Sequence, residues 1–98
     1  MTAFNVVKFN VRSGQEKAFL EAHAGDKARW PGLVRGTIIK TGEGSYCLIG
    51  EWSDLDALIA ARPAMIETLN TFRALLDDQG TGKGITDAVS GEVALTIA

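Results

Sequence analysis

The single histidine of this chain, His23, is the side chain best suited to move a proton near neutral pH. Its imidazole is the one side-chain group whose ordinary pKa lies in that range, so it could be the general base that takes a proton from a substrate. Phe19 stands four residues before it and Trp30 seven after it, so the three lie near one helix face, which should point at a sheet. The alternative is a partly exposed helix histidine with a solvent or backbone partner.

Three further candidates occupy alternate positions of the segment Ser45–Trp52, so they share one face if this segment is a strand. The indole of Trp52 could stack on a flat substrate, or it could fill a corner of the core. Tyr46 could donate a hydrogen bond to a bound anion, or it could lie at the exposed start of the strand. Gly50 lies between them, where a missing side chain leaves room for a ligand or lets a helix approach closely.

Two polar residues could complete such a site. Asn5 has the same strand parity as Val7 and Phe9 and could line the same cleft, although an asparagine near a strand end more often hydrogen-bonds locally. Arg73 lies at the far end of the second predicted helix, and its role as a substrate contact depends on the family resemblance described below. For Arg73 and Arg62 the alternative is an amphipathic helix edge, with the stem buried and the charged head in solvent.

Composition disfavours several partners and kinds of site. Ten Lys and Arg against twelve Asp and Glu give a net charge of −2, so we expect no nucleic-acid partner and no membrane partner. One histidine and one cysteine, Cys47, exclude a Cys/His zinc site and a disulfide within one chain, and we expect no metal. The glycine-rich run around Lys83 lacks the Ser or Thr that a phosphate loop requires after its lysine. Without a signal-like start or a long apolar run, the expected location is the cytoplasm.

The hydrophobic pattern predicts four strands and two helices. The strands are expected over 4–11, 33–41 and 45–52 and around Val93, Leu95 and Ile97, and the helices over 13–29 and, after a cap at Ser53 or Asp54, to about residue 78. Residues 42–44 form the predicted hairpin loop. Pro63 should break or kink the second helix, because proline removes a backbone donor and clashes with the preceding turn. Together these elements make one domain over residues 1–98.

The element order βαββαβ is typical of an α+β ferredoxin-like fold, a four-stranded antiparallel sheet with both helices on one face. The opposite face is also apolar, because Phe4 and Val6 of the first strand and Cys47 and Ile49 of the third point there. An apolar sheet face in water is an interaction patch. Pairing two copies face to face across a two-fold axis covers it, so we predict a homodimer.

With this architecture the sequence resembles the antibiotic biosynthesis monooxygenase family, whose members form dimeric α/β barrels. The resemblance spans roughly Phe4 to Ile97, and its carriers are Val11–Gln15 at the end of the first strand, the junction Trp30–Leu33, and Tyr46–Ser53 leading into the second helix. Each motif is short and degenerate. Together they occur in the order and spacing that the family shows, so they indicate the fold more than an activity.

The resemblance implies chemistry without a cofactor. Family members that oxidise polycyclic phenols use neither metal nor flavin; they deprotonate the phenol, transfer an electron from the anion to oxygen, and supply a dry pocket. Trp52 matches the family's tryptophan, whereas its asparagine and tyrosine positions fall on Leu48 and Leu58. The family's arginine position lands near Phe72 or Arg73. A quinol-oxidising branch of the family is similar to this chain at about the same level.

The leading hypothesis is a cofactor-independent monooxygenase that acts on a small phenolic or quinol-type aromatic molecule and molecular oxygen. Its catalytic candidates are His23 and Trp52, and its substrate-binding candidates are Tyr46, Asn5, Gly50 and Arg73. The rival hypothesis is a non-catalytic protein that binds a small ligand, or a purely structural dimeric barrel. The absent counterparts of the family's asparagine and tyrosine favour this rival.

Overall fold

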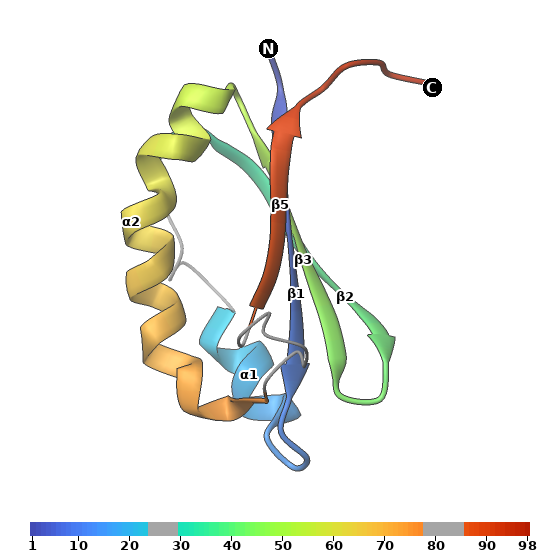
Figure 1. The fold of residues 1–98 in the computed structure, drawn as a ribbon, viewed down its shortest axis with the longest axis vertical. Helices are drawn as coiled ribbons and strands as arrows, with labels where there is room; N and C mark the ends of the chain where they lie inside the picture. The colour runs from blue at the N-terminus through green and yellow to red at the C-terminus, as the bar shows by residue number, and fades with distance from the viewer. Residues whose placement is uncertain (24–29, 78–85) are drawn as a thin grey trace.

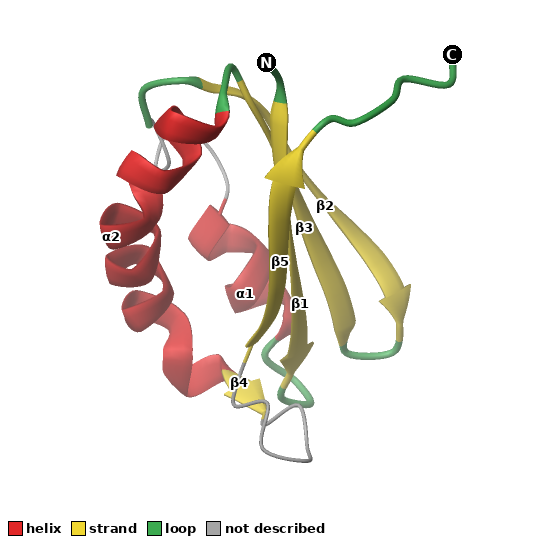
Figure 2. Ribbon diagram, turned by 45° about the horizontal axis from the view of Figure 1, so that its top comes forward, coloured by secondary structure: helices red, strands yellow, loops and turns green. Residues whose placement is uncertain are grey.

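The computed structural model describes residues 1–23, 30–77 and 86–98 (Figure 1). The elements in chain order are β1 (Ala3–Val11), α1 (Glu16–His23), β2 (Leu33–Gly42), β3 (Ser45–Trp52), α2 (Leu55–Phe72), the 3-10 helix η2 (Arg73–Leu75), β4 (Leu76–Asp77) and β5 (Thr86–Glu92). Both α-helices lie on one side of an antiparallel sheet, so the predicted α+β ferredoxin-like architecture is confirmed (Figure 2). None of the helices in these three ranges is long and apolar enough to span a bilayer.

The described sheet has five strands, one more than predicted, in the order β2-β3-β1 with β4 and β5 both on the free edge of β1. β5 pairs with β1 from Ala3 to Phe9, and β4 pairs with the remaining residues Asn10 and Val11. We had assigned β4 to the second helix. That helix ends at Phe72. After the 3-10 turn, Leu76 pairs with Val11 in the sheet and is buried, with 2% of its surface exposed.

The predicted position of the last strand is wrong. We expected it around Val93, Leu95 and Ile97, but β5 ends at Glu92, which pairs with Ala3. One further backbone bond joins the Val93 N–H to the Thr2 carbonyl at 2.8 Å, and beyond it β1 has no residues left to pair with. The apolar alternation of the tail is real, but Leu95 and Ile97 are 79% and 94% exposed and lead away from the sheet (Figure 1).

The ends of α2 show how local chemistry sets its path. Asp54, one of two predicted caps, has extended backbone, and its Oδ1 accepts a hydrogen bond from the Ala57 N–H at 2.7 Å. The predicted break at Pro63 is absent, since α2 continues through it to Phe72. Pro63 and Ile59 are both exposed, so water can bind the Ile59 carbonyl that the missing proline N–H leaves free. The predicted continuation of the first helix to 29 and the glycine-rich loop at 79–84 lie outside the described residues.

Two clusters of buried side chains hold the helices on the sheet. The first gathers around α1 and consists of Phe9, Val11, Phe19, Tyr46, Phe72 and Leu76. The second lies under the beginning of α2 and consists of Ala3, Trp52, Leu58 and Ala61. Members of both clusters also line the cavities described below, which therefore lie where the two packed regions meet.

The sheet face opposite the helices carries apolar side chains that stay in contact with solvent. Val89 of β5 pairs with Val6 on this face and is 67% exposed, and Ile39 of β2 is 43% exposed. The predicted homodimer would cover this surface. It stays a prediction here.

Candidate functional site

Two adjoining cavities of about 400 Å³ and about 240 Å³ lie between the sheet and the helices. The residues that line both are Asn5, His23, Trp30, Leu48 and Met65. The larger cavity extends between α2 and β5, and the smaller one extends to Trp52 and β2. A mostly apolar cavity of several hundred Å³ with a few converging polar groups is the usual form of a small-molecule site.

A buried hydrogen bond between Trp52 and Asn5 forms the polar centre of this site. The indole Nε1–H donates to Asn5 Oδ1 at 2.8 Å, and these residues are only 1% and 6% exposed. Gly50 lies opposite Asn5 in the β1–β3 register. A Cβ on Gly50 would collide with Asn5 Oδ1 and lie 3.0 Å from the indole nitrogen. The missing side chain therefore makes room for this side-chain pair, and Gly50 also lines the smaller cavity.

The Asn5 amide keeps donor capacity toward the cavity. Because Oδ1 accepts the indole N–H, the orientation of the amide is fixed, and Nδ2 faces the Met65 sulfur at 3.8 Å. A thioether is a weak acceptor, and an NH₂ group has two hydrogens to donate. Asn5 can therefore donate to an oxygen atom of a molecule in the cavity, and such donors stabilise developing negative charge.

Trp30 and Trp52 form a flat wall of the smaller cavity. Their ring centroids lie 6.2 Å apart with an angle of 18° between the ring planes. We had grouped Trp30 with His23 on one helix face and had not proposed it as a site residue. Trp30 lies outside any helix, so helical spacing from His23 does not account for its place in the site.

His23 lines both cavities in a form suited to accept a proton. Its Nδ1 lies 2.9 Å from the Phe19 carbonyl, and because a carbonyl can only accept, Nδ1 carries the hydrogen of the neutral ring. Nε2 then keeps its lone pair, and it has no hydrogen-bond partner within residues 1–23, 30–77 and 86–98. Burial lowers the pKa of His23 below 6.5, against a smaller opposing effect of the Phe19 carbonyl.

Aromatic rings surround this histidine and account for its burial. The ring of Phe72 lies 4.5 Å from that of His23, Phe19 lies at 4.8 Å and Phe9 at 6.1 Å. These rings exclude water and offer no charge that would favour imidazolium. The arrangement keeps His23 neutral, which is the state a general base requires.

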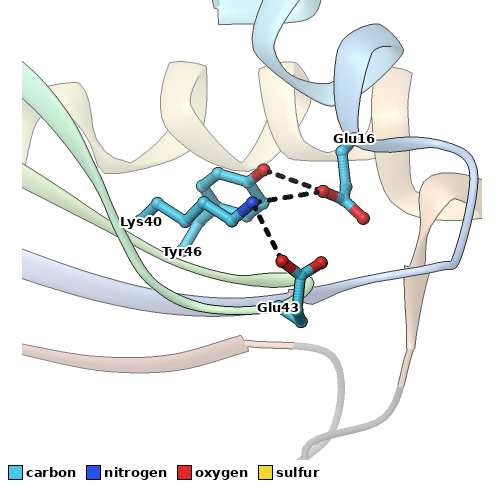
Figure 3. A network of polar contacts seen from close by, with 4 residues as sticks. All are labelled: Glu16, Lys40, Glu43 and Tyr46. Carbon is cyan, nitrogen blue, oxygen red and sulfur yellow. Dashed lines mark hydrogen bonds and ion pairs between the residues drawn. The ribbon is translucent and has the colours of Figure 1, made fainter.

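Tyr46 is not among the described residues that line the two cavities. Its ring packs on Phe19 with centroids 5.2 Å apart, and its hydroxyl donates to Glu16 Oε2 at 3.3 Å. Lys40 Nζ lies 3.8 Å from the same oxygen and 3.6 Å from Glu43 Oε1 (Figure 3). Burial and the Glu16 charge raise the pKa of Tyr46, so its hydroxyl stays protonated and donates.

This polar network instead positions His23. Glu16 begins α1, and Phe19 and His23 follow on the same helix face at intervals of three and four residues. Tyr46 and Lys40 come from β3 and β2, so they fasten the first turn of α1 to the sheet (Figure 3). Tyr46 therefore acts on the site through α1, at a distance from the cavities.

Arg73 is also outside both cavities. Its guanidinium Nε and Nη2 donate to Asn70 Oδ1 at 3.1 Å and 2.9 Å on an exposed surface. Arg62, which we had treated as a solvated helix edge, lines the larger cavity and donates from Nη2 to the Ser90 hydroxyl at 2.9 Å. Helical spacing alone could not find this contact, because it depends on where β5 pairs.

No three His, Cys, Asp or Glu side chains in the described part of the chain come together in a way that could hold a metal ion. Of the predicted site residues, the structure gathers His23, Trp52, Asn5 and Gly50 around the smaller cavity. Cys47 is buried in the sheet.

Comparisons by sequence identify no relative. No family model matches this chain. No curated protein matches it either.

Solved structures, in contrast, are similar over nearly the whole chain. SnoaB, a cofactor-independent oxygenase from Streptomyces nogalater, is 25% identical, with a TM-score of 0.69 over 98% of this chain and 96% of its own. A monooxygenase from the gene ActVA-Orf6 of Streptomyces coelicolor, in complex with the ligand nanaomycin D, is 21% identical, with a TM-score of 0.71 over 98% of this chain and 90% of its own. A Deinococcus radiodurans protein assigned to the antibiotic biosynthesis monooxygenases reaches 0.75 at 10% identity, over 98% of this chain and 96% of its own.

These structures confirm the resemblance that the short sequence motifs indicated. Several neighbours carry the name antibiotic biosynthesis monooxygenase, and two of them cover 95% and 98% of this chain. The chain has the fold of that family.

Proposed function

We propose that this chain, which has the fold of the antibiotic biosynthesis monooxygenases, is a cofactor-independent oxygenase of a small phenolic or quinol-type aromatic. The observation that carries the proposal is the meeting of a half-buried His23, whose pKa is lowered, with the Asn5–Trp52 pair on the walls of the same cavities. Two solved neighbours support it: SnoaB is a cofactor-independent oxygenase, and the Streptomyces coelicolor monooxygenase holds nanaomycin D.

In the proposed reaction the aromatic substrate enters the cavities and His23 Nε2 takes the phenol proton. The Asn5 Nδ2–H donates to the resulting phenolate oxygen. The phenolate passes one electron to molecular oxygen, and the aryloxyl radical and superoxide combine at a ring carbon as a peroxide. Imidazolium protonates the peroxide, His23 then takes the C–H proton, and the O–O bond breaks. The ring keeps one oxygen as a quinone carbonyl, and the other leaves as hydroxide, which becomes water with the proton from His23.

The apolar walls contribute to this chemistry by exclusion of water. Leu48 and Met65 line both cavities, and Trp30 and Trp52 form a flat surface against which an aromatic ring can lie. A dry cavity strengthens the contact between Asn5 and the anion. It also protects the radical pair from side reactions.

Oxygen consumption with a panel of hydroquinones and naphthols tests this proposal. We expect turnover by the wild type and a loss of about 100-fold or more in His23→Ala, the scale of a missing general base. Added 4-methylimidazole should restore part of the rate to His23→Ala, and one atom of ¹⁸O₂ should enter the product. Oxygen uptake that is equal in wild type and His23→Ala, or absent with every substrate, would refute the proposal.

A second candidate function is ligand binding without turnover, and Leu48 favours it. The resemblance to the monooxygenase family implies an asparagine at the position that Leu48 occupies, and Leu48 presents an apolar surface to both cavities. This function would show as a ligand-dependent rise in melting temperature for compounds that consume no oxygen. Ligand binding with ¹⁸O incorporation would rule it out.

We further propose a cytoplasmic homodimer that covers the outer sheet face. Ile39 on that face and Ile59 on α2 are equally exposed, at 43% and 45%, so they form a matched pair. Ile39→Lys should shift the sedimentation coefficient from dimer to monomer, whereas Ile59→Lys should leave the dimer intact. A wild-type monomer at high protein concentration would contradict this assembly.

A further inference from the structure

Arg62 is a cation at the edge of the larger cavity. It lies on α2 and reaches across to β5, where its Nη2 donates to the Ser90 hydroxyl at 2.9 Å. Both residues are exposed and both line the cavity, so this contact lies at its mouth. A substrate that enters between α2 and β5 passes the guanidinium.

The charge of Arg62 is uncompensated in the described part of the chain. No carboxylate within residues 1–23, 30–77 and 86–98 lies within ion-pair distance of it. Among the described residues that line the two cavities, Arg62 is the one Lys, Arg, Asp or Glu side chain, and burial disfavours a charge on His23. Ser90 occupies one donor group of the guanidinium, and the fork has other N–H groups to offer a planar anion.

The strand register places this cation beside the polar centre of the site. Ser90 pairs directly with Asn5, and Asn5 pairs with Gly50, so the three residues form one row across β5, β1 and β3. Side chains directly opposite each other on neighbouring strands lie about 5 Å apart. Arg62, bonded to Ser90, therefore lies at the outer end of the row whose centre is Asn5.

The opposite limit of the larger cavity is the aromatic surroundings of His23. Phe72 contacts the His23 ring, and it stands ten positions after Arg62 on α2 (72 − 62 = 10), which is about 15 Å along a helix. A substrate with two or three fused rings can span most of this length. It would place one end near Arg62 and the other near His23.

We propose that the substrate is an aromatic carboxylate whose acid group pairs with Arg62 while its phenolic hydroxyl reaches His23. This inference rests on the proposed function and adds the substrate class. Arg62 is then a specificity-determining residue: it selects anions and orients the ring, and His23 acts on the far end. The net charge of −2 gives the whole chain no general attraction for anions, so the selection is local.

Anaerobic calorimetry with 6-hydroxy-2-naphthoate and its neutral isostere 6-hydroxy-2-naphthamide tests the pairing. We expect the acid to bind about tenfold more tightly to the wild type, the scale of one charge-assisted hydrogen bond. Arg62→Gln should bind both compounds equally, and Arg62→Lys should keep part of the preference. Equal binding of acid and amide by the wild type, or an unchanged preference in Arg62→Gln, would overturn the inference.

Ser90→Ala separates recognition from a purely structural contact. This variant removes the hydrogen bond between α2 and β5 but keeps the charge, so the preference for the acid should persist. If Ser90→Ala loses the preference for the acid as Arg62→Gln does, the Arg62–Ser90 hydrogen bond only holds α2 against β5, and the inference fails. Oxygen uptake without acid preference would refute the aromatic carboxylate and leave the oxygenase standing. If the wild type binds neither the naphthoate nor the naphthamide, the result counts against both the aromatic carboxylate and the proposed oxygenase function.

Discussion

The two ends of the larger cavity are built in opposite ways. The closed end is lined by Phe9, His23 and Phe72, and Phe19 packs against these three rings, with ring centroids 4.5–6.1 Å apart. The open end, formed by Arg62, Ala88 and Ser90, is exposed on α2 and β5 alike. One end is packed and carries no charge, and the other is loosely covered and carries a cation.

This difference separates chemistry from recognition. At the closed end, packing removes water and lowers the pKa of the imidazole, so the packing that stabilises this end also keeps the base unprotonated. At the open end, exposure leaves a charged group free to meet an incoming molecule, at little expense to the fold. We therefore expect substitutions at the closed end to alter stability, and substitutions at the open end to alter binding.

The largest expected contrast is between Phe19→Ala and Ala88→Phe. Phe19 is fully buried, so its truncation should lower the free energy of unfolding by about 3–5 kcal/mol. Ala88→Phe adds a ring at the exposed open end and should change stability by less than about 0.5 kcal/mol while it weakens binding of aromatic ligands. Urea unfolding followed by circular dichroism, together with calorimetry, measures both quantities. A strongly destabilised Ala88→Phe would contradict this difference between the closed end and the open end of the cavity.

The next largest effect is expected at Gly50, which lines the smaller cavity. Gly50→Ala displaces the Asn5–Trp52 hydrogen bond and should lower the free energy of unfolding by about 2–3 kcal/mol. Gly36 lies beside Gly50 on β2 in the same cross-strand row, and a Cβ there would meet nothing within 4 Å. Gly36→Ala is therefore the matched control, and its unfolding midpoint in urea should match the wild type.

A smaller effect should appear in the pH dependence of stability. The folded pKa of His23 lies below its unfolded value of 6.5, so the unfolded chain binds more protons between these two values. The free energy of unfolding should thus fall as the pH drops through 6.5 and toward the folded pKa. His23→Gln should lack this component. Identical slopes of stability against pH for the two proteins would show that the closed end does not hold the imidazole neutral.

The smallest effect is expected for Tyr46→Phe. The variant loses the hydrogen bond to Glu16 but keeps the ring on Phe19, so stability should fall by about 1 kcal/mol or less. Because Tyr46 lines neither cavity, the KM for an aromatic substrate should stay close to that of the wild type. A large rise in KM would mean that Tyr46 contacts the substrate after all.

Much of the fold could be predicted because local chemistry determines it. The alternation of Val7, Phe9 and Val11 and the cap at Asp54 act over a few residues and needed no tertiary information. The last strand could not be placed in this way. Both Thr86–Glu92 and the tail that follows have strand-like patterns, and the pairing with β1 decides between them.

The site was predictable where parity and spacing carried the information. Trp52 and Gly50 share a strand face, and Asn5 belongs to the same face of the neighbouring strand, so these three converge. Arg62 and Met65 join them only because α2 lies across β1 and β5, which no short motif encodes. Tyr46 shares the correct face, but Phe19 and Glu16 of α1 cover it, and Arg73 lies on an exposed surface of the chain.

The stacked indoles of Trp30 and Trp52 give this protein a built-in optical reporter. They are its two tryptophans, and both belong to the wall of the smaller cavity. All of the tryptophan emission of the chain therefore originates within a few ångströms of any occupant there. An electron-rich or quinonoid ring that enters should quench that emission, so occupancy can be titrated in unlabelled protein under nitrogen, before oxygen is admitted.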